Sequence, residues 1–250
     1  VSGLVAIVLV PIMLRGLGAE LYGLWVAAQV VAALPAGLDL GLGMTVTRAI
    51  AGAADTRSRS ESARFVTSAG SAFLLFGLVG GGIIAVAGLP LSGGLHLSAE
   101  TARIAPVVFA LCGLGFFADQ FLAFSRAVFL GLRRFDIANL TAISTVLIRA
   151  AGIVAVLALG GALVSVVIWQ AVASGLAAGA TLFLIGRLEP QYRLPVGRFD
   201  WISVRGRVPF SLKSQLAMGA MKAVWEPPMI FVGLVRGSVS MVPYYIGQKF

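Results

Sequence analysis

Charged residues stand inside long apolar stretches of this sequence, where each needs a compensating partner. Counting inward from the ends of these stretches places five of them near mid-depth: Asp39, Asp119, Arg149, Lys222 and Glu226. A charge at the centre of a bilayer costs at least about 2.5–3.5 kcal/mol. Such side chains face a bundle interior or a watery cavity and pair there. We therefore expect a chamber lined by charged side chains. The structural alternative is that these charges pair only to fix the register of the helices.

Polar residues at helical spacing extend these charges into stripes. One stripe contains Ser211, Gln215, Gly219, Lys222 and Glu226, and a shorter one contains Thr141, Thr145, Arg149 and Gly152. Steps of three and four residues place each stripe on one helical face. Asp119 and Arg126 are seven residues apart and also share a face. The two stripes are the candidate lining of the chamber.

Metal and disulfide chemistry have little support in the sequence. Cys112 is the one cysteine and His96 the one histidine, and neither lies in a cluster of metal-ligating residues. We expect no metal and no cofactor.

The composition indicates that the segments carrying these charges lie in a membrane. Hydrophobic residues make up 59% of the 250 residues, charged residues only 12%, and the net charge is +9. A soluble core cannot bury so much apolar sequence. The basic residues gather in short connectors between apolar runs, as in membrane proteins, so nucleic acid is not an expected partner.

Seven membrane spans and the start of an eighth are predicted. The spans are Val1–Leu14, Tyr22–Ile50, Phe65–Leu91, Ile104–Leu130, Leu140–Leu159, Leu163–Ile185 and Pro209–Leu234. Runs of this length exceed those of a barrel strand, so the fold class is all-α, a polytopic transmembrane helix bundle. The first run is short for a span, and we expect the front of that helix to be missing.

Connector charge predicts the orientation. Every second connector is rich in arginine: Arg57, Arg59 and Arg64, then Arg133 and Arg134, then Arg187, Arg193, Arg198, Arg205 and Arg207. The intervening connectors are poor in basic residues. The positive-inside rule places the arginine-rich side in the cytoplasm. A multi-pass protein of the cytoplasmic (inner) membrane of a bacterium is expected.

Three segments are expected along the chain. Residues 1–186 form an N-terminal six-helix lobe, 187–208 a cytoplasmic linker or interfacial helix, and 209–250 the incomplete start of a C-terminal lobe. Pro35, Gly37, Asp39, Gly41 and Gly43 occur near the middle of the second span. This combination disrupts a helix, as in transporter binding sites, although a kink used only for packing is the alternative.

Three motifs resemble a known family. They are Leu17-Gly18-Ala19-Glu20-Leu21-Tyr22-Gly23-Leu24-Trp25, Leu38-Asp39-Leu40-Gly41-Leu42-Gly43 with Thr47-Arg48, and Gly131-Leu132-Arg133-Arg134-Phe135-Asp136-Ile137-Ala138-Asn139. The chain resembles the Wzx-type polysaccharide flippases of the multidrug/oligosaccharidyl-lipid/polysaccharide exporter superfamily. The resemblance implies two helical lobes around a central cavity. It also implies alternating-access transfer of an undecaprenyl-diphosphate-linked oligosaccharide to the periplasmic leaflet, for cell-surface polysaccharide synthesis.

That cargo suggests roles for the charged residues. The expected diphosphate contacts are Arg149 and Lys222, with Arg48 and Lys213 receiving the head group on entry. The acids Asp39, Asp119 and Glu226 are expected to hold these cations in the empty cavity, or to take up a coupling H+ or Na+. Gln215 and Thr145 are expected as polar cavity residues. Other expected partners are membrane lipids, a polysaccharide polymerase and glycosyltransferases.

Two other functions fit part of the sequence. A drug/cation antiporter of the same superfamily has the same expected fold, but its cargo favours a cavity dominated by acids. A membrane glycosyltransferase or ligase needs catalytic carboxylates or histidines in a sizeable loop, and the outward connectors are short. We therefore expect a transporter and not an enzyme.

Overall fold

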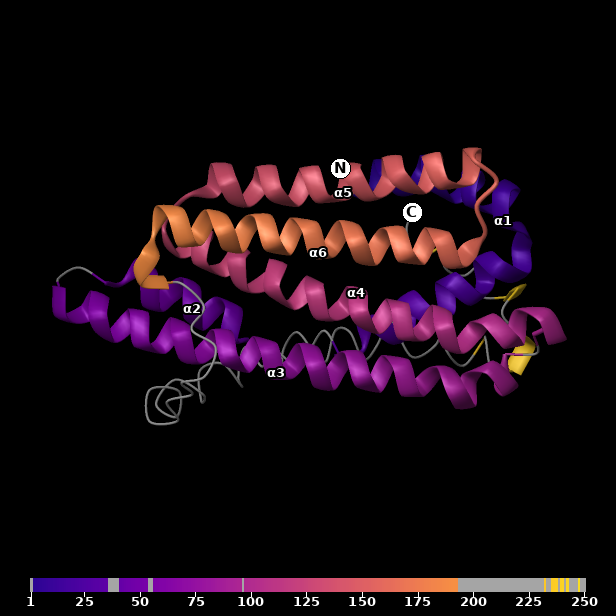
Figure 1. The fold of residues 1–250 in the computed structure, drawn as a ribbon, viewed down its shortest axis with the longest axis horizontal. Helices are drawn as coiled ribbons and strands as arrows, with labels where there is room; N and C mark the ends of the chain where they lie inside the picture. The colour runs from indigo at the N-terminus through magenta and orange to yellow at the C-terminus, as the bar shows by residue number, and fades with distance from the viewer. Residues whose placement is uncertain are drawn as a thin grey trace.

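The chain folds into a bundle of long helices (Figure 1). The computed structural model describes residues 2–35, 41–53, 56–95 and 97–192, with short stretches between 232 and 247. The helices are α1 (Ser2–Ala33), α2 (Leu42–Ala51), α3 (Thr56–Gly94), α4 (Ala99–Gly131), α5 (Phe135–Ala158) and α6 (Leu163–Leu188), followed by a short 3-10 turn, η2 (Pro190–Tyr192). These described residues contain no β-strand, which confirms the all-α prediction.

Helix α1 is bent at Gly18 into two arms. Gly18 has φ 81° and ψ 165°, a conformation outside the helical region that glycine adopts at low cost. The first arm extends along α5, where Gly16 lies beside Leu157, and the second arm returns toward α2 (Figure 1). The first arm corresponds to the first predicted span, and the second arm corresponds to the first part of the second predicted span, Tyr22–Ile50. The expected connector between them is reduced to a sharp bend.

The second predicted span is interrupted where the sequence places its prolines and glycines. Helix α1 ends at Ala33, and α2 begins at Leu42 after Gly41, whose φ of 69° is left-handed. Pro35 lies against Gly80, near the middle of α3. The predicted disruption of this helix is therefore confirmed. Asp39 lies outside the described residues.

Close helix contacts hold α4 at the centre of the bundle. Helix α4 runs beside α3, and the backbones of Gly81 and Gly113 nearly touch, since a Cβ built on Gly113 would be 2.4 Å from the Gly81 carbonyl oxygen. The Thr47 hydroxyl of α2 donates to the Ala127 carbonyl of α4 at 3.0 Å. Small residues at such crossings allow helices in membranes to pack backbone to backbone.

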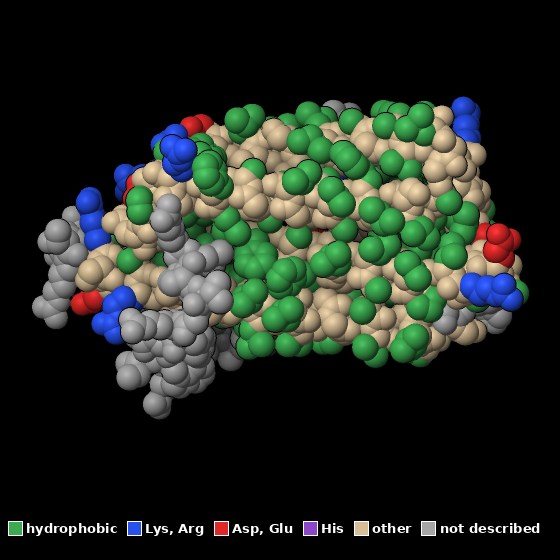
Figure 2. Space-filling view, viewed as in Figure 1, with side chains coloured by type: hydrophobic (Ala, Val, Ile, Leu, Met, Phe, Trp, Pro, Cys, Tyr) green, Lys and Arg blue, Asp and Glu red, His purple; other side chains and the backbone are tan. Residues whose placement is uncertain are grey.

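Apolar side chains cover the long sides of the bundle, and the charges gather at its two ends (Figure 2). Five helical stretches of the described chain are long and apolar enough to cross a membrane: Val5–Ala33, Ser58–Leu91, Ala99–Gly131, Phe135–Ala158 and Leu163–Leu188. Exposed leucines such as Leu78, Leu147 and Leu176 suit contact with lipid. The chain is a multi-pass membrane protein.

Most of the described arginines lie at one end of the bundle. We call one end of the bundle the arginine-rich end, where α2 and α6 finish and where α4 turns into α5; it carries Arg48, Arg59, Arg64, Arg133, Arg134 and Arg187. Arg15 and Arg103 lie at the opposite end, where Glu20 accepts a hydrogen bond of 2.7 Å from the Ser98 amide at the start of α4. The seventh predicted span and most of the expected linker at 187–208 lie outside the described residues.

Candidate functional site

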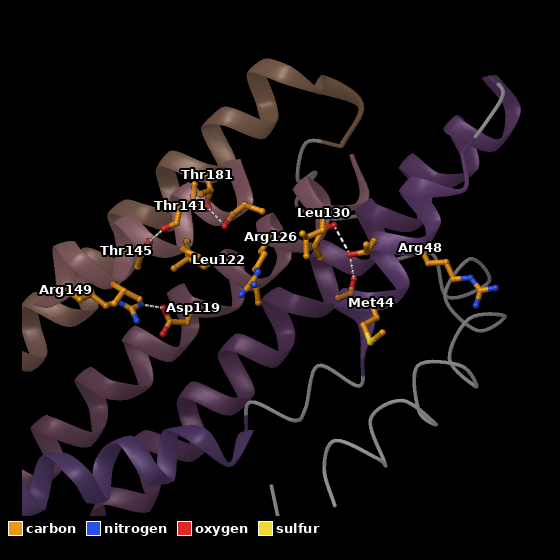
Figure 3. A pocket seen from close by; sticks show the side chains of 17 residues that line it. Met44, Arg48, Asp119, Leu122, Arg126, Leu130, Thr141, Thr145, Arg149 and Thr181 are labelled. Atoms are coloured by element: carbon orange, nitrogen blue, oxygen red, sulfur yellow. Dashed lines mark hydrogen bonds and ion pairs between the residues drawn. The ribbon is translucent and has the colours of Figure 1, made fainter. Parts of the chain in front are cut away.

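A cavity of about 790 Å³ opens between α2, α4, α5 and the end of α6 (Figure 3). We call it the main cavity. It reaches from the middle of α4 and α5 toward the arginine-rich end. Its charged lining residues are Arg48, Asp119, Arg126 and Arg149, and its hydroxyl-bearing lining residues are Thr47, Thr141, Thr145 and Thr181. Within the described chain, three cations and one acid therefore line this space.

An ion pair lies at the inner end of the main cavity. The Arg149 guanidinium of α5 donates through one terminal nitrogen to Asp119 of α4 and to the Ser174 hydroxyl of α6. Ser174 in turn donates to the Gln170 carbonyl at 2.8 Å. The cluster thus ties three helices together at mid-depth, and Arg149 keeps further N–H groups for another acceptor.

One nitrogen of the Arg149 guanidinium, Nε, is buried and has no hydrogen-bond partner among the described residues. A buried N–H of a charged group is costly when left unpaired. Within the described residues this N–H remains without an acceptor.

Arg126 is a second cation of the main cavity, and it is less constrained. It lies two helical turns beyond Asp119 on α4, about 10 Å along the axis at 1.5 Å per residue. Its side chain is exposed, and among the described residues it makes no ion pair or hydrogen bond. In Figure 3 it lies between the Arg149–Asp119 pair and Arg48. The three arginines form a series from mid-depth to the arginine-rich end.

The threonines line the cavity with hydroxyls that are already oriented. Thr145 donates to the Thr141 carbonyl at 2.7 Å, and Thr141 donates to the Ile137 carbonyl at 2.8 Å. Each hydroxyl proton is therefore engaged with the helix backbone. The oxygens remain as hydrogen-bond acceptors, which suit water or sugar hydroxyls more than an anion.

A second cavity of about 390 Å³ adjoins the main one, between the second arm of α1, α4 and α6. We call it the side chamber. Asp119, Ala123 and Arg149 line both spaces. The side chamber extends from this shared wall toward the beginning of α4, away from the arginine-rich end. The ion pair is thus the boundary between the two cavities.

The structure brings together four of the predicted site residues: Arg48, Asp119, Thr145 and Arg149 all line the main cavity. Arg126 was noted in the sequence only for sharing a face with Asp119, and its place in the cavity was missed. The seven-residue spacing was the signal for it. The other predicted site residues lie outside the described residues: Asp39, Lys213, Gln215, Lys222 and Glu226.

Metal-ligating side chains do not cluster in the part of the chain that is described. No group of three or more His, Cys, Asp or Glu residues occurs there. Cys112 is buried in the helix packing as a free thiol. The polar groups of the two cavities are instead guanidinium, carboxamide, hydroxyl and carboxylate groups.

Comparison with known proteins gives one match. The family model described as "Polysaccharide biosynthesis protein" matches residues 1–219. No curated protein and no solved structure matches the chain.

Proposed function

This chain belongs to the polysaccharide biosynthesis protein family, the family of the Wzx-type polysaccharide flippases, and we propose that it moves an undecaprenyl-diphosphate-linked oligosaccharide across the bacterial inner membrane. Family membership supports a membrane flippase or exporter role in polysaccharide synthesis. It also favours a transporter over an enzyme. The cargo, the direction from cytoplasmic to periplasmic leaflet and the alternating-access cycle are parts of the proposal.

The physical problem of such a cargo is its diphosphate. Two or more negative charges cannot cross hydrocarbon without groups that replace their hydration shell. Guanidinium groups do this well, because they bind phosphate oxygens through paired, charge-assisted hydrogen bonds. The observation that carries the proposal is that Arg126 and Arg149 both line the main cavity, and that Arg126 makes no ion pair or hydrogen bond among the described residues.

The arrangement suggests an order of contacts. Arg48, on the last turns of α2 at the arginine-rich end, is the first cation that an entering head group meets. Arg126 lies next along the cavity, and Arg149 lies deepest. Asp119 neutralises Arg149 in the empty cavity, and the diphosphate takes over part of that role on binding.

The rest of the predicted site extends this proposal beyond the described residues. Lys222 and Lys213 are proposed as further diphosphate contacts, and Asp39 and Glu226 as acids that hold cations or take up a coupling H+ or Na+. Gln215 is proposed as a polar cavity residue.

A lipid-linked oligosaccharide cargo also implies glycosyltransferases that make it and a polymerase that uses it, together with the surrounding membrane lipids as partners. The segments 187–208 and 209–250 are proposed as linker and start of a second lobe.

The net charge of the described lining argues against the antiporter alternative. Among the described lining residues of the main cavity, Arg126 makes no ion pair, and Asp119 is the acid paired with Arg149. A cavity with this surplus of positive charge repels a cationic drug and attracts an anionic lipid.

Translocation measured in proteoliposomes tests the proposal. The full-length protein, Arg149→Ala, Lys222→Ala and Arg126→Gln are each reconstituted with a fluorescent lipid-linked oligosaccharide. Appearance of the sugar in the opposite leaflet is then followed by its oxidation by added periodate, which cleaves the vicinal diols of the sugars it can reach. We expect transport by the wild type and strong loss in the three variants. Unchanged transport in Arg149→Ala and Lys222→Ala together would contradict the site assignment.

Arg103→Gln is the matched control for these variants. Arg103 is an exposed arginine at the opposite end of the bundle and does not line either cavity. Its replacement removes the same charge from the protein, and transport is expected to stay at the wild-type rate.

A further inference from the structure

The side chamber has a different polar chemistry from the main cavity. Beyond the Asp119–Arg149 pair, its polar lining side chains are Gln29, Gln120, Gln170 and Ser174. Carboxamides and hydroxyls are neutral groups that both donate and accept hydrogen bonds. The shared ion pair is itself internally compensated. The side chamber therefore suits a neutral ligand rich in hydroxyl groups better than an anion.

Two of its amides are held in fixed positions with free hydrogen-bonding groups. Gln170 Oε1 accepts from Trp25 Nε1 at 3.2 Å and from Gln29 Nε2 at 3.4 Å. Within the described residues, no hydrogen bond is made by Oε1 of Gln29 or by Nε2 of Gln170. The chamber thus offers one amide acceptor from α1 and one amide donor group from α6, both at membrane depth.

Unpaired amide groups are costly in an apolar surrounding unless a ligand or water pairs with them. The other walls of the chamber are apolar and include Leu111, Phe116 and Val167. Sugars match such a lining, because their hydroxyl rims need donors and acceptors while their C–H faces pack on apolar side chains. The volume of about 390 Å³ lies within the range of about 300–1,000 Å³ that is usual for small-molecule sites.

The connection between the two cavities matches the covalent structure of a lipid-linked sugar. The first sugar of such a lipid is bonded directly to the diphosphate, so a site for it must adjoin the phosphate site. Arg149 lines both cavities, with Asp119 and Ala123 beside it. A diphosphate on Arg149 in the main cavity therefore places the attached sugar at the mouth of the side chamber.

We propose that the side chamber binds the sugar next to the diphosphate, with Gln29 and Gln170 hydrogen-bonding to its hydroxyl groups. This inference rests on the proposed function, since it assumes a diphosphate cargo in the main cavity. It adds a recognition element for the sugar, at residues that neither the motifs nor the charged stripes singled out.

Binding of two lipids to the detergent-solubilised full-length protein tests the inference. The probes are undecaprenyl diphosphate and the same lipid carrying one glucose. The variants are Gln29→Leu and Gln170→Leu, because leucine has a similar size but no hydrogen-bonding groups. Gln191→Leu is the control, since Gln191 is an exposed glutamine outside the membrane helices.

We expect each leucine variant of the chamber to bind the glucose-bearing lipid about fivefold to tenfold more weakly than the wild type. Binding of undecaprenyl diphosphate should stay unchanged, as should both affinities of Gln191→Leu. Should a leucine variant aggregate, Gln29→Asn keeps the amide but withdraws it by one methylene, and the same selective loss is expected.

Equal weakening for both lipids, or no weakening for either, would overturn the sugar site while leaving the proposed function intact. A wild-type protein that binds neither lipid would instead contradict the proposed function itself. The two failures are therefore distinguished within one set of titrations.

Discussion

Arg126 and Arg149 line the same cavity but differ in what surrounds their guanidinium groups. Arg149 is tied to Asp119 and Ser174, whereas Arg126 is exposed and makes no ion pair or hydrogen bond in the described chain. Removing Arg149 leaves Asp119 without its counter-charge, so folding and binding are affected together. Arg126 contributes little to packing and is the cleaner probe of cargo binding.

Arg126→Gln is expected to weaken binding of a diphosphate lipid by about tenfold to a hundredfold, because hydrogen bonds to charged groups contribute about 1.5–3 kcal/mol. Thermal stability in detergent should remain within about 0.5 kcal/mol of the wild type, as for other exposed side chains. Lipid titration and a melting curve on the same sample measure both quantities. A variant with wild-type affinity would remove Arg126 from the binding site.

In the proposed function, Asp119 competes with the cargo for Arg149, so we expect its neutralisation to have the opposite effect on binding. Asp119→Asn keeps an oxygen acceptor for Arg149 but removes the negative charge. We expect tighter binding of undecaprenyl diphosphate, by about fivefold, and slower turnover because release becomes harder. Lipid titration and the translocation assay measure these two effects.

Asp136→Asn is the control for this charge change. Asp136 pairs with Arg134 at 3.4 Å on the exposed surface of the arginine-rich end, where ion pairs contribute little. Weaker binding in Asp119→Asn, or an equal change in both variants, would contradict the competition between Asp119 and cargo.

At the scale of the helices, the position of the cavity depends on how closely α4 approaches its neighbours. Gly113 lies against Gly81 of α3, and Gly131 lies against Ile50 and the Thr47 carbonyl of α2. The contacts with Gly81 and with the Thr47 carbonyl are made by backbone atoms, which cannot shift as a flexible side chain does. They fix α4, and with it Asp119 and Arg126, relative to the cavity walls.

Gly113→Ala is expected to destabilise the protein by about 1–3 kcal/mol, because overpacking forces the two helix backbones apart. A Cβ at this position would lie 2.4 Å from the Gly81 carbonyl oxygen. Thermal unfolding in detergent measures the loss. Gly82→Ala, where nothing lies within 4 Å of an added Cβ, is the matched control and should be neutral or slightly stabilising. Equal stability of the two variants would show that the α3–α4 contact is looser.

At the scale of the whole molecule, the orientation in the membrane is a prediction from charge. The turn between α4 and α5 belongs to the arginine-rich end, and the turn between α5 and α6 belongs to the opposite end. In a Cys112→Ala background, Arg134→Cys should react with a membrane-impermeant maleimide only from the cytoplasmic side. Leu159→Cys, whose parent side chain is 88% exposed, should react only from the periplasmic side. Labelling of both from one side would contradict the topology.

Features that depend on local composition could be predicted from the amino-acid sequence alone. Long apolar runs predicted membrane helices, and four of the predicted spans are found in α3–α6. Their ends lie within five residues of the predicted ones, except that α3 begins nine residues before the predicted Phe65. Pro35 and Gly41 predicted the interruption between α1 and α2, because proline and left-handed glycine disfavour a continuous helix wherever they occur. Arg149 and Asp119 were recognised as cavity residues, since a charge at mid-depth requires compensation whatever its partner is.

Which of these groups meet depends on how the helices pack against one another. Pairing of Asp119 with Arg149 across two helices, and the convergence of Trp25 and Gln29 on Gln170, depend on helix rotation and crossing. Neutral glutamines carry no signal at mid-depth comparable to a charge, so the side chamber was not predicted. Helical periodicity places a residue on a face, but which face looks into a cavity is set by close contacts such as Gly81 with Gly113, far apart in sequence.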